Sequence, residues 1–155
     1  MKPWLFRRLI NLWPPFLGAG IRVREISSDW RYVRVELVAN RLNRNYVGTH
    51  FGGSLFAMTD PFLMLMYLKA LESDCVVWDH SASIRFVKPG RGTVAAEFCL
   101  EESDLEEVRR AVAGDERYLK EHEVRVMDAD GECVARVERT LYFRLKERNR
   151  PPGRG

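Results

Sequence analysis

Residues 51–71, FGGSLFAMTDPFLMLMYLKAL, form the segment that most restricts how this chain can fold. The segment is almost continuously apolar, is too long for a strand and is rich in Leu, Met and Phe, so it predicts a helix that is hydrophobic on most sides. A helix of this kind has to be buried. Because strand-like runs dominate the rest of the chain, the simplest packing wraps one antiparallel sheet around this helix, which predicts an α+β fold.

Six runs of alternating or β-branched residues predict the strands of that sheet. They span residues 21–26, 30–38, 75–87, 93–100, 118–127 and 132–145. The last two flank the turn DADGE, which is typical of a β-hairpin. In the run 75–87 the alternation predicts one apolar face, made of Val76, Trp78, Ala82, Ile84 and Phe86. A charged stretch, residues 101–114, predicts a short surface helix.

The first 17 residues predict a short amphipathic helix. Its apolar stripe, ended by two prolines, consists of Trp4, Leu5, Leu9, Leu12 and Trp13. Two arginines interrupt the apolar run, which is untypical of a secretion signal. We expect this helix to dock on the domain or on a sister subunit, with membrane contact as the lesser alternative. Residues 18–146 would then form a single domain, and residues 147–155 a disordered basic tail.

Composition argues against several classes of function. The formal net charge of +3 equals that of the last ten residues, which hold four basic side chains and one acid, so the remainder is neutral and we expect no nucleic-acid partner. Three widely spaced cysteines without a CxxC pattern predict reduced thiols in a cytoplasmic protein. No pair of histidines has the spacing of metal ligands, so we expect no metal.

Two glycines and one carboxylate interrupt the apolar segment. The backbone N–H groups of Gly52 and Gly53 would lie at a helix start and could bind an oxyanion, although two glycines can also simply make a tight turn before Ser54. Asp60 allows two interpretations. It could be the N-cap of a helix opened by Pro61, or it could project from a longer, kinked helix with few polar neighbours, where functional acids are common.

Other polar residues near this segment could contact a ligand. His50 stands beside the glycines and could reach a substrate. Three cations surround the turn KPGRG and could hold phosphates, namely Arg85, Lys88 and Arg91. Cations on a surface turn also commonly serve solubility alone.

The pattern Asn45, Gly48, Gly52 and Gly53, followed seven residues later by Asp60, resembles the hotdog-fold acyl-CoA thioesterases. The longer runs FGGSLFAMTDPFLMLM and VVWDHSASIRFVKPGRGTV are similar to an uncharacterised thioesterase-like branch of that superfamily, a domain of unknown function. The similarity covers roughly residues 18–143. It implies a hotdog fold, in which an antiparallel sheet wraps around a long central helix, with subunits paired into dimers or tetramers and sites between them.

The resemblance also implies catalytic roles. The N–H of Gly53 would polarise the thioester carbonyl, while Asp60 would activate water or attack directly, across the dimer interface. Asn45 would help to place the acid or the water. This chain reads FGG where better-studied thioesterases read HGG, so the role of their histidine does not transfer to His50.

The implied substrate-binding residues are Gly52, Phe51, His50, Arg85, Lys88 and Arg91, the three cations being candidates for the phosphates of coenzyme A. Four apolar side chains could line an acyl tunnel, although core packing is the main expectation for them: Phe56, Met58, Phe62 and Met66. The resulting expectation is a cytoplasmic homodimer or homotetramer that hydrolyses an acyl-CoA or acyl-carrier thioester. Coenzyme A would be part of the substrate, and no other cofactor is expected. The alternative is a non-catalytic module of the same fold that binds acyl-CoA or an acyl chain.

Overall fold

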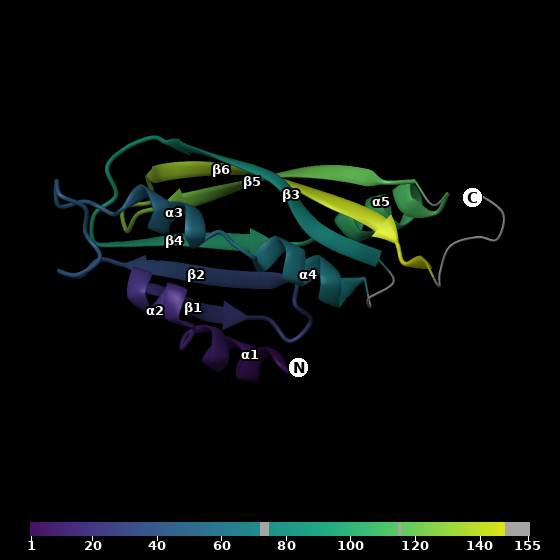
Figure 1. Ribbon diagram of the computed structural model, residues 1–155, viewed down its shortest axis with the longest axis horizontal. Coiled ribbons are helices and arrows are strands. Elements are labelled where there is room, and N and C mark those ends of the chain that lie inside the picture. Colours follow the sequence, from purple (N-terminus) through teal and green to yellow (C-terminus); the bar gives the residue numbers. More distant parts are fainter. Residues whose placement is uncertain (72–74, 115, 148–155) are drawn as a thin grey trace.

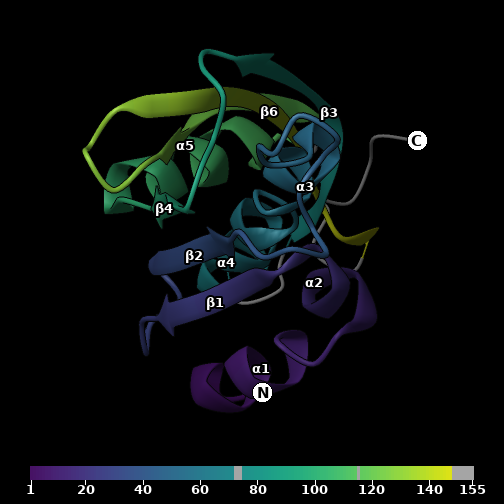
Figure 2. The same ribbon diagram turned by 90° about the vertical axis from the view of Figure 1, so that its left-hand side faces the viewer.

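The computed structural model describes residues 1–71, 75–114 and 116–147. Six strands form one antiparallel sheet in the order β1-β2-β4-β5-β6-β3. The strands are β1 (Ile21–Ile26), β2 (Tyr32–Val38), β3 (Cys75–Phe86), β4 (Thr93–Cys99), β5 (Tyr118–Met127) and β6 (Cys133–Leu145). Each lies within two residues of its predicted bounds. The sheet curls around α3 (Gly52–Ala57) and α4 (Phe62–Ala70), which confirms the predicted α+β class (Figures 1 and 2).

The two central helices fill the concave side of the sheet because α4 is apolar on nearly all sides. Met58, Phe62, Met66 and Tyr67 are at most 1% exposed, and burying each such side chain contributes about 2 kcal/mol to folding. The charged helix α5 (Glu102–Val112) adds its buried side chains to the same core: Leu105, Val108 and Val112. Of the four side chains considered for an acyl tunnel, three are therefore buried in the core and Phe56 is partly buried against it.

The long helix predicted over residues 51–71 is interrupted between α3 and α4. Pro61 has no backbone N–H to donate, so a regular helix cannot continue through it. The turn before it tightens, because the N–H and the hydroxyl of Thr59 both donate to the carbonyl of Phe56, at 3.1 and 2.8 Å. The peptide bond between Asp60 and Pro61 is cis. Two short helices at an angle thus replace one long helix, and Asp60 lies between them.

Helix α1 (Pro3–Ile10) and helix α2 (Pro14–Ala19) replace the single N-terminal helix that was predicted. The prolines end the first helix and also begin the second. Asn11 then lies along the free edge of β1, where its side chain accepts from the Val23 N–H at 2.7 Å and donates to the Val23 carbonyl at 3.0 Å. Residues 148–155 of the predicted tail lie outside the described residues.

Strand β3 forms the opposite edge of the sheet and contains a β-bulge. The register shifts between Asp79 and Ser81. Asp79 lies opposite the fully buried Leu141, so its side chain is on the core side of the sheet, as is that of Ile84. The predicted apolar face, which placed Trp78 together with Ile84, is therefore wrong: Trp78 is on the outer face, 47% exposed. The bulge moves the strand's alternation by one residue.

Candidate active site

Phe51, Gly52 and Gly53 form the entrance to α3. Phe51 is the N-cap residue, and its carbonyl accepts from the N–H groups of Ser54 and Leu55. Gly52 and Gly53 are the first two helical residues, so their N–H groups have no intrahelical acceptor. In the described part of the chain, no side chain caps this helix. Both N–H groups are thus available to an oxygen atom of a bound molecule.

Both glycines lie directly beneath aromatic rings. A Cβ atom on Gly52 would come within 2.8 Å of Cζ of Phe86, and one on Gly53 would overlap the ring of Phe51. The two rings are themselves more than half exposed, at 56% for Phe86 and 59% for Phe51. Glycine at these positions therefore lets two exposed aromatic rings approach the backbone at the start of α3.

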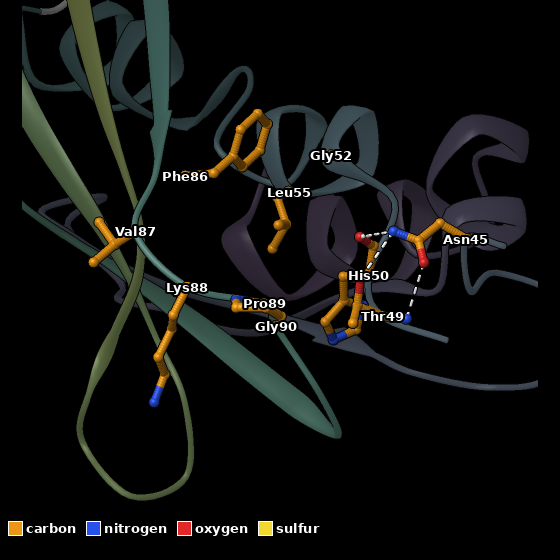
Figure 3. A pocket seen from close by; sticks show the side chains of 10 residues that line it. All are labelled: Asn45, Thr49, His50, Gly52, Leu55, Phe86, Val87, Lys88, Pro89 and Gly90. Atoms are coloured by element: carbon orange, nitrogen blue, oxygen red, sulfur yellow. Dashed lines mark hydrogen bonds between the residues drawn. The ribbon is translucent and has the colours of Figure 1, made fainter. Parts of the chain in front are cut away.

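A cavity of about 440 Å³ lies beside this entrance, between the loop before α3 and the segment that follows β3 (Figure 3). Four of the predicted site residues line it: Asn45, His50, Gly52 and Lys88. The other five are not among its lining residues: Phe51, Gly53, Asp60, Arg85 and Arg91. The structure therefore does not bring all the predicted site residues to one cavity.

Asn45 uses its side-chain amide to hold the loop that leads into α3. Its Nδ2 donates to Oγ1 of Thr49 at 2.9 Å and to the carbonyl of His50 at 3.2 Å, and its Oδ1 accepts from the Thr49 N–H at 2.9 Å (Figure 3). These contacts place Asn45 in a positioning role for the loop at the cavity edge.

His50 is buried, 4% exposed, and its ring is fixed by one hydrogen bond. Nε2 lies 2.9 Å from the carbonyl of Gly92. Because a carbonyl only accepts, Nε2 carries the proton and Nδ1 is left as an acceptor. Nδ1 is buried and has no hydrogen-bond partner among the described residues. Burial lowers the pKa of His50, Arg44 lowers it further and the Gly92 carbonyl opposes them, so the neutral ring is favoured.

Asp60 lies in the interruption between α3 and α4 with its side chain 56% exposed. It is not an N-cap, because α4 begins at Phe62 with Pro61 in the cap position. The structure is thus nearer to the second interpretation of Asp60, an acid projecting from a broken helix. Burial raises the pKa of this carboxyl group, Arg139 opposes the rise and Asp79 adds to it.

Arg139 on β6 is the charged partner of Asp60. Only 3% of its side chain is exposed, and its Nη1 donates to Oδ1 of Asp79 at 2.8 Å. Nε and Nη2 both lie 3.3 Å from Oγ1 of Thr59, and Nη2 lies 3.6 Å from Oδ2 of Asp60. A buried guanidinium needs such partners, because an unpaired charge in the core is very costly. The cation thus ties the sheet to the helix interruption.

The sequence contains a signal for this cluster that the prediction did not use. The core-facing positions of β6 are alternate residues, and Arg139 occupies one of them between Val137 and Leu141. An arginine in the apolar register of a strand indicates a buried charge with a partner. The partner, Asp79, could not be identified from the sequence, because only the β-bulge places it on the same side of the sheet as Arg139.

The three cations of the KPGRG region do not form one group. Lys88 is bound by two acids of the turn between β5 and β6, with 2.6 Å to Asp128 and a shorter contact to Glu132, and these hydrogen bonds raise its pKa to about 12. In Figure 3 its side chain points away from the other lining residues. Arg91 borders a second hollow with Lys88, whereas Arg85 lies opposite Arg136 on β6.

The described residues contain neither a cluster of metal ligands nor a membrane-spanning helix. Among residues 1–71, 75–114 and 116–147, no group of His, Cys, Asp and Glu side chains is arranged to hold a metal ion. Within the same ranges, no helix has the length and apolar character needed to cross a membrane. The three cysteines, Cys75, Cys99 and Cys133, are free thiols.

Residues 2–143 match the profile of a family described as a domain of unknown function, DUF4442. This chain belongs to the DUF4442 family. No curated protein is similar to it in sequence.

Solved structures resemble this DUF4442 protein over nearly its whole length. A Pseudomonas aeruginosa protein of unknown function, described as a "Probable Thioesterase", has a TM-score of 0.80 and 19% identity over 92% of this chain and 95% of that chain. A protein of unknown function from Chlorobaculum tepidum has a TM-score of 0.72 and 11% identity over 94% and 98%. A thioesterase from Haemophilus influenzae has a TM-score of 0.66 and 12% identity over 94% and 92%. These likenesses confirm the hotdog fold.

Proposed function

We propose that this DUF4442 protein hydrolyses an acyl thioester, with Asp60 as the catalytic acid–base or nucleophilic group. The observation that carries the proposal is the setting of Asp60, a half-exposed carboxylate with a raised pKa in the break between two otherwise apolar helices. A carboxylate in such a setting is often functional. The thioesterases among the structures of the same fold support this reaction class.

The proposed chemistry uses Gly53 at the start of α3 and Asp60, which would act across the subunit interface. The thioester carbonyl oxygen would accept a hydrogen bond from the N–H of Gly53, which stabilises the negative charge that develops on it. Asp60 in its deprotonated form would either take a proton from the attacking water or form an acyl intermediate that water then cleaves. In both routes the C–S bond breaks and the thiol leaves. Gly52 and Asn45 would position the entrance.

The site would be completed by a second subunit. Strand β3 is a sheet edge of 12 residues, and an uncovered edge of this length is suited to pairing with another chain. Phe51, Phe86 and Val87 near that edge are more than half exposed. A homodimer or homotetramer that covers them would enclose both the α3 entrance and the cavity beside it.

The substrate would be an acyl-CoA or an acyl-carrier thioester in the cytoplasm, consistent with three free thiols. Phe51 and His50 would border the acyl thioester. Of the three predicted phosphate-binding cations, Arg85 and Arg91 are better candidates than Lys88, because Lys88 already pairs with two acids. The alternative, a module that only binds the acyl thioester, draws support from the contact between Asp60 and Arg139, which gives Asp60 a structural partner.

The test is hydrolysis of short, medium, long and aromatic acyl-CoAs, with free CoA separated by chromatography. Asp60→Asn is expected to lower kcat by about 10²-fold or more while binding persists, because the amide cannot act as a base or nucleophile. Glu106→Gln, at an exposed position of α5, is the matched control and should keep full activity. Saturable binding without turnover of any substrate would instead establish the binding module.

A further inference from the structure

We propose that α1 and α2 form a docking surface for an anionic lipid membrane. The surface consists of six large apolar side chains that the domain leaves uncovered. Their exposed fractions are 52% for Trp4, 38% for Leu5, 53% for Leu9, 69% for Leu12, 49% for Trp13 and 49% for Leu17. We call this set the α1–α2 face. The inference does not depend on the proposed hydrolase activity.

The α1–α2 face is distinct from the face by which α1 binds the domain. Ile10 is buried and Phe6 packs on Trp30 with 5.3 Å between ring centroids, so these two residues anchor the helix. At about 100° per residue, Trp4 and Leu5 point away from them, and Leu9 lies on the flank of the helix, where it is 53% exposed. The helix thus docks on the domain through Phe6 and Ile10, whereas the side chains of the predicted stripe stay exposed in this chain. Figure 2 shows α1 as the outermost layer beneath β1.

The fixed position of α1 argues that its exposed side chains are held outward. The Arg7 guanidinium donates to the carbonyl of Arg24 at 2.7 Å, and Asn11 binds both backbone groups of Val23. Phe16 of α2 is 3% exposed and packs on Phe62 of the core at 6.0 Å between centroids. Because both helices are attached through other residues, their tryptophans and leucines cannot turn inward without breaking these contacts.

The charge of this region identifies the occupant. The first 24 residues contain five basic side chains, Lys2, Arg7, Arg8, Arg22 and Arg24, and no acid. Arg24 pairs with Glu36 of β2 at 2.6 Å, so the other four carry the excess charge of this region. Arg8 stands over the ring of Trp4, 5.4 Å from its centroid, so cationic and apolar groups share one surface. Tryptophan, leucine and nearby cations are the side chains by which interfacial helices bind anionic bilayers.

A second copy of the chain is a less suitable occupant. In a twofold interface each patch meets itself, so the cations of α1 would face the same cations without a compensating acid among the first 24 residues. Apart from that region and the basic tail the sequence carries excess acid, since the whole chain has a net charge of only +3. The positive charge is thus concentrated beside the apolar face, which favours a negatively charged lipid surface.

Flotation with vesicles tests the proposal on the full chain. We expect binding to vesicles of equal parts phosphatidylcholine and phosphatidylglycerol, with little binding to phosphatidylcholine alone. Lys2→Glu/Arg8→Glu should weaken binding at least about tenfold, because each cation near an anionic surface strengthens binding about fivefold and two cations are replaced by anions. Leu9→Ser/Leu12→Ser should weaken it similarly. Both pairs are exposed, so an unchanged unfolding midpoint is expected for each.

Matched controls place the same chemical changes elsewhere. Arg110→Glu on α5 and Leu119→Ser on β5 are exposed positions outside the α1–α2 face and should bind vesicles as the parent chain does. Absence of vesicle binding, or equal loss in the controls, would overturn the proposal. A third result would also overturn it: the parent chain does not bind vesicles, self-associates with rising concentration, and loses this self-association in both test variants. A second copy of the chain would then cover the face.

Discussion

At the scale of single residues, the carboxylate of Asp60 is governed by groups that act in opposite directions. Burial and Asp79 both raise its pKa, and Arg139 lowers it. Two of these three influences come from the sheet and not from the helices beside Asp60. A residue found from the sequence alone therefore depends for its chemistry on two that are more than 15 positions away along the chain.

Activity should rise with pH through a pKa above the ordinary value of 3.8 for an aspartic acid. The sign follows from the mechanism: only the deprotonated carboxylate is a base or nucleophile, so the rate is lost as pH falls through the pKa of the folded protein. Asp79→Asn should move the midpoint of the kcat/KM profile down, and Arg139→Gln should move it up. Shifts in the same direction for both variants would contradict this account.

Arg139 should also be important for stability. In Arg139→Met the partly buried Asp79 loses its ion-pair partner, and we expect the free energy of unfolding to fall by about 3 kcal/mol. Arg139→Met/Asp79→Asn should recover part of that loss, because position 79 then no longer carries a charge without a partner. Arg136→Met, an exposed position on the same strand, is the control and should change stability by less than about 0.5 kcal/mol. Urea unfolding of the four proteins measures these differences. A double variant less stable than Arg139→Met would count against the pairing.

At the scale of secondary-structure elements, the two edges of the sheet are treated differently. The edge at β1 is covered by α1, and Asn11 binds the N–H and the carbonyl of Val23 as a neighbouring strand would. The edge at β3 has no such cover from the described residues. Since an open edge is suited to pairing with another chain, the proposed assembly would use β3 and not β1.

Asn11→Ala should lower the free energy of unfolding by about 1–2 kcal/mol, because two part-buried backbone groups of Val23 lose their partners. Asn11→Asp keeps the acceptor for the Val23 N–H and loses the donor, so its effect should be intermediate. Hydrogen exchange of the Val23 amide should quicken in Asn11→Ala and change less in Asn11→Asp. Equal stability of all three proteins would show that the edge needs no cap.

Alternation along the chain predicted the strands well but predicted their faces less well. From Ala135 to Phe143 in β6 the alternation is unbroken, so the buried positions Val137, Leu141 and Phe143 could be read from it. Within β3 the bulge after Asp79 reverses the faces. A bulge depends on the fit between two strands far apart in sequence, so a single-strand pattern does not show it.

At the scale of the whole molecule, the buried His50 and the partly buried His122 couple stability to pH. Burial lowers the pKa of both His50 and His122 from the ordinary 6.5. Nε2 of His122 and the hydroxyl oxygen of Tyr67 share a hydrogen bond of 3.0 Å. A lowered pKa means that the unfolded chain binds protons more readily than the folded one as pH falls below 6.5.

The free energy of unfolding should therefore be fully developed above pH 6.5 and should fall as pH drops through the window below it. His50→Gln should flatten this dependence, because glutamine does not titrate and can still donate to the Gly92 carbonyl. Denaturant titrations at several pH values measure the slope. His80→Gln is the control, since His80 is exposed. If neither His50→Gln nor His122→Gln changes the slope of the unfolding free energy against pH, these histidines are not its cause.

The sequence by itself determined the order and bounds of the strands, the burial of the 51–71 segment and the candidates Gly52, Gly53 and Asp60, because these follow from local periodicity and from residues that break it. The tertiary structure decided which residues surround them. It placed Arg139 beside Asp60, gave Lys88 two acidic partners and left the N-terminal tryptophans exposed. Such contacts join segments far apart in the chain, and they depend on sheet register and helix placement, which no local pattern specifies.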